Sequence, residues 1–115
     1  MIPAGWTPHR RDDGEVLGWI RPSGERWVAV DRLGREASGA LEWLEAEAVL
    51  DERGLGWLAE RWLLNGEPVR IAEVTDERIV VLGDEYGAAS AVGGTPRRIE
   101  LPWPAPEGLR LSPRR

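Results

Sequence analysis

Two apolar runs near the start of the chain predict a β-hairpin. Residues 16–21 and 26–31 are rich in β-branched and aromatic side chains, which is typical of strands. Residues 22–25, with the sequence Pro-Ser-Gly-Glu, predict a four-residue loop between them. This register places Trp19 opposite Val28. It also makes both faces of the hairpin apolar, so each face needs a covering layer.

Gly18 lies in the middle of the first predicted strand, and in the same register it faces Ala29. The missing side chain leaves a shallow notch, which another backbone or a ligand could approach. We expect internal packing to fill this notch, because that is the commoner use of a strand glycine.

One helix is predicted after the hairpin. Good helix formers run from Leu41 to Arg53, Ser38 or Gly39 can begin the helix, and Gly54 suits its C-terminal cap. The apolar residues form two stripes, one of Leu41, Leu44 and Ala48 and the other of Trp43, Ala46, Val49 and Leu50. One stripe should face the sheet. The second requires cover from the N-terminal arm, the C-terminal tail or a second chain.

After Gly56 the hydrophobic period changes to two, which predicts an antiparallel meander. Asn65-Gly66 is the strongest short hairpin signal in the chain. Strands are expected at residues 57–64, or at least from Arg61, and at 67–74, 78–82 and 97–101, with a weak strand at 88–92. The predicted fold is therefore α+β, with an N-terminal β-hairpin, one central helix and an antiparallel β-meander that forms a small open barrel or sheet. Its surplus apolar surface is buried either by closure around the helix or in a homodimer.

Proline and glycine are frequent near both ends of the chain, and they predict an arm and a tail that flank a central domain. Residues 1–14 are expected to form an extended arm, residues 15–101 a single α+β domain, and residues 102–115 a Pro-rich tail. The sequence Pro-Trp-Pro-Ala-Pro that begins the tail favours polyproline II. We expect the tail to wrap its own domain instead of presenting Trp103 to another protein.

Composition adds an unusual set of aromatic residues. The chain has seven Trp and no Phe, which points to the rim of a small core or to a binding surface. It has no Cys and no Lys, and its Arg, Ala, Gly and Pro content is typical of a GC-rich genome such as that of an actinobacterium. Neither a signal peptide nor a membrane-spanning run is evident, so a cytoplasmic location is expected.

Charge argues against a nucleic-acid partner. The formal net charge is -5, with the acidic residues in the middle and the basic ones at both ends. Neighbouring Arg and Trp residues, such as Arg61-Trp62, could stack single-stranded bases, or they could form cation–π pairs within the protein.

No catalytic or metal-binding motif is present. His9 is the only histidine, and it lies in the predicted arm beside two Arg residues. Acidic residues occur in turns or on a helix face, without the spacing of a metal site. We therefore expect no cofactor and no metal, and we assign no catalytic residue.

These observations favour a non-enzymatic binding or protein-interaction module that uses a Trp/Arg surface. The predicted binding residues are Trp62, Tyr86, Trp103, Arg61 and Arg98. A second copy of the chain or another protein is the expected partner. Two alternatives stay open: binding of single-stranded nucleic acid, and a small enzyme that uses carboxylates such as Asp84 or Glu85.

Overall fold

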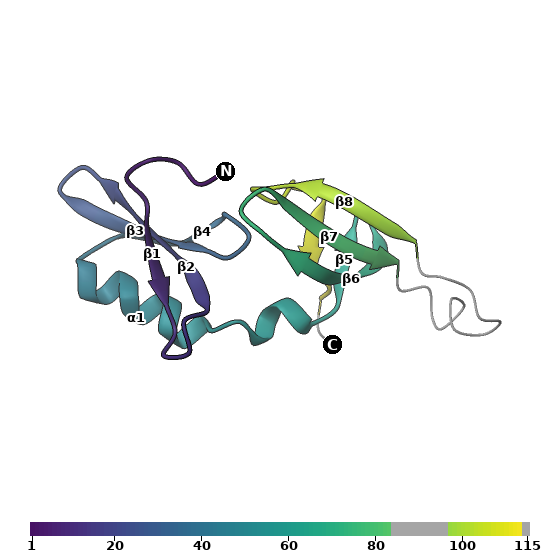
Figure 1. Ribbon diagram of the computed structural model, residues 1–115, viewed down its shortest axis with the longest axis horizontal. Helices are drawn as coiled ribbons and strands as arrows, with labels where there is room; N and C mark the ends of the chain where they lie inside the picture. Colours follow the sequence, from purple (N-terminus) through teal and green to yellow (C-terminus); the bar gives the residue numbers. More distant parts are fainter. Residues whose placement is uncertain (84–96, 114–115) are drawn as a thin grey trace. The chain divides into compact units, whose positions relative to one another are not determined.

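The computed structural model describes residues 1–83 and 97–113, and the chain divides into two compact units. Unit 1 is Met1–Trp57 and unit 2 is Leu58–Arg115. Each unit contains one antiparallel sheet, and unit 1 also contains the helix α1 (Figure 1). The predicted α+β class, hairpin, central helix and meander are confirmed, and neither sheet closes into a barrel within the described residues. The expected division into arm, single domain and tail stays a prediction.

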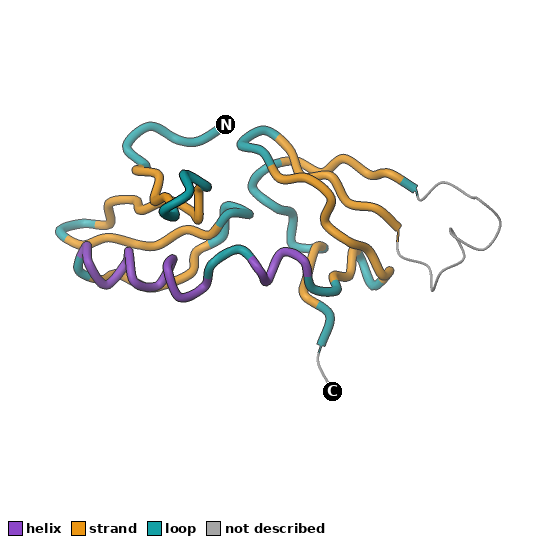
Figure 2. Tube along the Cα trace, turned by 60° about the horizontal axis from the view of Figure 1, so that its bottom comes forward, coloured by secondary structure: helices purple, strands orange, loops and turns teal. Residues whose placement is uncertain are grey.

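Unit 1 has a four-stranded meander in which neighbours along the chain are neighbours in the sheet. The strand order is β1-β2-β3-β4, with all pairs antiparallel. Figure 2 shows α1 lying along this sheet. The elements are β1 (Thr7–Arg10), β2 (Val16–Ser23), β3 (Arg26–Asp31), β4 (Glu36–Leu41) and α1 (Trp43–Arg53).

The β2–β3 hairpin is tighter than predicted. Ser23 pairs with Arg26, so the loop has two residues instead of four, and Gly24 supplies the positive φ of 62° at its first position. Trp19 consequently pairs with Val30 and not with Val28. Because this shift is two residues, and side chains alternate with a period of two, the predicted faces are unchanged.

Gly18 is a point of close contact between β2, β3 and α1. It pairs with Asp31 and not with the predicted Ala29. A Cβ atom at Gly18 would lie 2.2 Å from the carbonyl oxygen of Val30 and 2.9 Å from Cδ2 of Leu50. The notch is thus filled from within unit 1, which confirms the expected internal packing.

The helix begins two residues later than predicted, because residues 36–41 form the edge strand β4. Glu42 precedes the first turn, and its N–H donates to the Glu45 carboxylate at 3.1 Å. The predicted helix start at Ser38 or Gly39 is therefore wrong. The C-terminal end is confirmed: Gly54 has a φ of 60° and its N–H donates to the Leu50 carbonyl.

One predicted stripe of α1 packs against the sheet; of the other, Leu44 and Ala48 are exposed, whereas Leu41 belongs to β4. The packed stripe is Trp43, Ala46, Val49 and Leu50, and it joins Leu17, Ile20 and Ala29 of the sheet in one core cluster. Trp43 also meets Trp27 of β3 edge to face, with ring centroids 4.8 Å apart. Leu44 of the second stripe is 76% exposed.

Asp31 is a buried carboxylate at the end of β3. Its Oδ1 accepts the N–H groups of Leu33 at 2.9 Å and Arg35 at 3.1 Å, which fixes the β3–β4 turn. Its Oδ2 lies 3.5 Å from a guanidinium nitrogen of Arg53. Burial raises the pKa of Asp31 above its ordinary value of 3.8, against the opposing effect of these contacts.

This raised pKa predicts how the stability of unit 1 depends on pH. In the window above pH 3.8 the folded chain binds more protons at Asp31 than the unfolded chain does, so its contribution to stability falls as pH rises. We expect the difference in free energy of unfolding between wild type and Asp31→Asn to shift in favour of the variant from pH 4 upward. Urea unfolding at a series of pH values measures this difference in free energy of unfolding. A shift in favour of the wild type as the pH rises would contradict the prediction.

Unit 2 is a five-stranded antiparallel sheet in the order β8-β7-β6-β5-β9, preceded by a short 3₁₀ helix, η1. Asn65-Gly66 forms the predicted two-residue turn, with φ values of 51° and 88°. The elements are η1 (Gly56–Ala59), β5 (Trp62–Leu64), β6 (Glu67–Val74), β7 (Arg78–Gly83), β8 (Arg98–Pro102) and β9 (Leu109–Leu111).

Two other expectations for this part of the chain have different outcomes. The predicted strand at residues 57–64 is wrong in its first half, because residues 56–59 are helical and only 62–64 are strand. The tail returns to its own sheet, since β9 pairs with β5, and this confirms the predicted wrap. The weak strand predicted at residues 88–92 lies outside the described residues.

Candidate binding pocket

The structure places the predicted binding residues in different environments. Trp62 on β5 is 2% exposed and Trp103 is 6% exposed, so neither ring offers surface to a partner in this structure. Arg61 and Arg98 are exposed, but two strands separate β8 from β5. Tyr86 lies outside the described residues, as do Asp84 and Glu85. The binding role of these residues stays a prediction that their burial and separation do not support.

The seven indoles are interior or half-buried groups. Trp19, Trp62 and Trp103 are buried, and the other four are half-buried. Among the described residues, Arg53 lies over the ring of Trp57 at 4.3 Å and Arg32 over that of Trp19 at 5.3 Å, both cation–π contacts. Neither is a pair of adjacent residues. The reason is geometric, because successive side chains of a strand point to opposite faces.

A pocket of about 290 Å³ lies in unit 2. Its wall combines the end of η1 with the middle of β6 and the facing residue of β7. Three of its side chains are half-buried aliphatics, and one is an exposed arginine. The lining residues are Leu58, Ala59, Arg70, Ile71, Ala72 and Leu82.

A β-bulge positions the β6 side of the pocket. Ile71 pairs with Val81 and Glu73 pairs with Val80, so Ala72 is an extra residue in the ladder. Such a bulge bends its strand and changes the direction in which the neighbouring side chains point.

An indole holds the η1 side of the pocket. Nε1 of Trp62 donates a hydrogen bond to the Leu58 carbonyl at 3.2 Å. This bond ties the end of η1 to the buried part of β5. Trp62, predicted as a surface residue, therefore acts in this structure as a support for one pocket wall.

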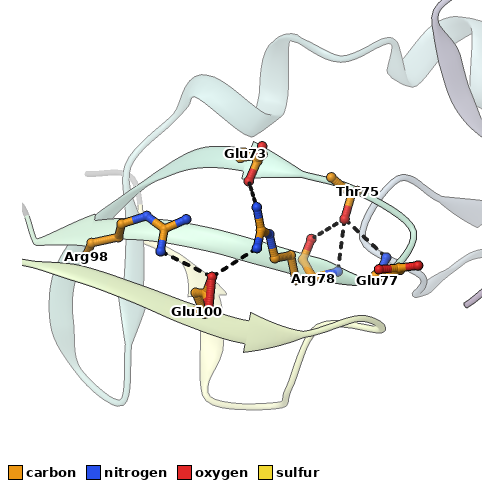
Figure 3. Close-up of polar contacts among 6 residues, drawn as sticks. All are labelled: Glu73, Thr75, Glu77, Arg78, Arg98 and Glu100. Carbon is orange, nitrogen blue, oxygen red and sulfur yellow. Dashed lines mark hydrogen bonds and ion pairs between the residues drawn. The ribbon is translucent and has the colours of Figure 1, made fainter.

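The charged residues of β6, β7 and β8 are mostly paired. Figure 3 shows Arg78 of β7 between Glu73 and Glu100, at 3.3 and 3.1 Å, with Arg98 also on Glu100 at 3.2 Å. The remaining β6 carboxylate, Glu67, pairs with Arg97 at 2.9 Å.

Arg70 is not part of this network. Its guanidinium forms no hydrogen bond or ion pair with any residue that the structure describes. The pocket thus presents an aliphatic wall beside a cation that has no ion-pair partner among the described residues. A guanidinium can bind a carboxylate through two parallel hydrogen bonds.

The described side chains offer little for acid–base or metal chemistry. Nε2 of His9 lies 2.8 Å from Asp51 and its Nδ1 lies 3.4 Å from Glu47, both on α1. Both ring nitrogens of His9 therefore face carboxylates of the helix. In residues 1–83 and 97–113, no group of three or more acidic, His or Cys side chains could hold a metal ion.

Sequence reasoning missed the pocket. The segment of Arg70, Ile71 and Ala72 has the pattern of an ordinary strand, and no local signal marks the bulge.

Within the described segments, no helix has the length and apolar character needed to cross a membrane. Comparison of the chain with models of protein families, with curated proteins and with solved structures finds no match.

Proposed function

We propose that this chain is a non-enzymatic protein-interaction module that binds its partner at the pocket of unit 2. The observation that supports this most is Arg70, an exposed cation without a partner among the described residues, beside the half-buried Leu58, Ile71 and Leu82. Protein interfaces combine an apolar centre with polar neighbours, and arginine is enriched among their strongest anchors.

The size of the pocket favours an anchor residue over a cofactor. At about 290 Å³ it lies just below the usual range for small-molecule sites, roughly 300–1,000 Å³. Such a volume accommodates a side chain of a partner protein, and the proposal includes no cofactor.

Other parts of the sequence-based hypothesis remain proposals beside this one. A cytoplasmic location and a homodimer are compatible with the module. Binding of single-stranded nucleic acid by neighbouring Arg and Trp residues stays a prediction, as does catalysis by Asp84 or Glu85, which lie outside the described residues. No observation favours either of them over the pocket.

Peptide selection tests the proposal. Random peptides displayed on phage are selected on the full chain, and their affinities are then measured for two variants. Ala72→Glu places a carboxylate within the pocket wall, and Ala40→Glu makes the same change at an exposed alanine of β4. We expect Ala72→Glu to weaken the selected peptides at least about tenfold, as loss of an interface anchor does.

The control should bind like wild type. Circular dichroism of both variants checks that they are folded. Equal binding by the two variants would refute the proposal, as would the failure of any peptide to be enriched over an unrelated protein.

A further inference from the structure

We infer that the pocket of unit 2 recognises the C-terminal residue of a polypeptide. In this arrangement Arg70 pairs with the terminal α-carboxylate, and an aliphatic side chain of leucine size occupies the apolar wall. The inference rests on the proposed function and goes further, because it names the chemical feature that the partner must carry.

The first argument is charge complementarity. On β6 and β8, Glu67, Glu73 and Glu100 are each paired with an arginine. Arg70, on the pocket wall, forms no ion pair with these glutamates or with any other carboxylate among the described residues. A ligand that supplies a carboxylate at this point would give Arg70 an ion-pair partner. Every unmodified polypeptide carries such a carboxylate at its C-terminus.

The second argument is size. A volume of about 290 Å³ equals that of roughly ten water molecules in the liquid, at about 30 Å³ each. A terminal leucine with both carboxylate oxygens has about nine heavy atoms, and a volume of this order accommodates it.

The third argument separates a chain terminus from an internal segment. An internal aliphatic residue would fill the wall but bring no charge to Arg70. A carboxylate at the chain end lies beside its own side chain, so one residue can satisfy the cation and the apolar surface together.

A free carboxylic acid shares this chemistry but fits the geometry less well. Sites for small molecules usually bury about 70–90% of the ligand, which requires more enclosure than a shallow strand bulge and one turn of η1 offer. A chain terminus needs only its last residue buried, since the rest of the peptide continues into solvent.

Fluorescence polarisation with labelled hexapeptides tests the inference. The probe is Gly-Ser-Gly-Ser-Gly-Leu, labelled at its N-terminus, as the free acid and as the C-terminal amide; a third peptide ends in Ser. We expect the full chain to bind the free acid at least about tenfold more tightly than the amide or the Ser peptide.

Arg70→Gln provides the matched test on the protein side. It should weaken the free acid about tenfold and remove the difference between acid and amide. Arg110→Gln changes an exposed arginine of β9, at the far edge of the same sheet, and should bind like wild type.

Each contrary result overturns the inference. Equal affinities for acid and amide, unchanged binding by Arg70→Gln, or no binding of the free acid up to about 1 mM would do so. Octanoate serves as the free-acid competitor, and tighter binding of octanoate than of the peptide would assign the pocket to a small acid. If peptides from the phage selection still depend on Ala72, the proposed function survives while this inference fails.

Discussion

Gly18→Ala is expected to lower the free energy of unfolding of unit 1 by about 3 kcal/mol or more, because the added methyl group has no space. Its Cβ would lie 2.2 Å from the Val30 carbonyl oxygen, a backbone atom held in the β2–β3 ladder. A flexible side chain could move away, but this carbonyl can move only if the strand pairing is distorted. The contact with Leu50 adds a second clash from the helix side.

Gly39→Ala is the matched control for Gly18→Ala. Gly39 also lies in a strand of unit 1, and a Cβ atom there meets nothing within 4 Å. We expect a change within about 0.5 kcal/mol, as for ordinary surface substitutions. Hydrogen exchange of the β2 and β3 amides reads the stability of unit 1 in the full chain. Similar protection in the two variants would contradict the tight contact at Gly18.

The second large effect is expected at Leu50. This side chain is 1% exposed and belongs to the core cluster between α1 and the sheet. Leu50→Ala removes its packing and leaves a cavity, which costs about 2–5 kcal/mol at comparable buried positions. The cost should lie at the upper end, because the Gly18 backbone opposite cannot easily collapse into the space.

Leu44→Ala is the matched control on the same helix. Leu44 is 76% exposed, so the same substitution removes few contacts and keeps a good helix former. Its effect should stay within about 0.5 kcal/mol. Urea unfolding followed by circular dichroism, together with hydrogen exchange of α1, compares the two variants. A loss at Leu44 equal to that at Leu50 would show that the outer stripe of α1 is also covered in solution.

Features encoded by neighbouring residues were predictable from the sequence. Asn65-Gly66 specifies its own turn because both residues tolerate positive φ, and β7 is apolar from residue 79 to residue 82. Gly54 ends the helix for the same local reason. The faces of the first hairpin were also correct, since alternation depends only on the parity of the register.

Features that depend on competition between neighbouring elements were not predictable. Ser38 and Gly39 suit a helix start, yet pairing of residues 36–41 with β3 is favoured over that local preference. Pro22 was assigned to a loop, although it lies in β2 beside Trp27. In both places the pairing between strands determines the structure. This pairing cannot be predicted from the residues that are neighbours along the chain.

The candidate site was beyond sequence reasoning for a similar reason. The large number of Trp residues favoured a surface of exposed rings, but in this structure the rings fill interior and half-buried positions. The pocket arises where a bulge at Ala72 meets η1, which Trp62 holds in place. Neither the bulge nor the indole hydrogen bond leaves a pattern that can be recognised along the chain.

The ion pairs on β8 have a consequence for the behaviour of the chain at high concentration. An edge strand with free backbone groups invites a strand from another molecule, and this is how many sheet proteins begin to form fibrils. On β8, Arg98 and Glu100 alternate with half-buried residues, and Pro102 at its end lacks an N–H. A second molecule that docked along this edge would have to place its own strand against fixed charges of both signs. We therefore expect this end of the sheet, as the described residues form it, to resist uncontrolled self-assembly.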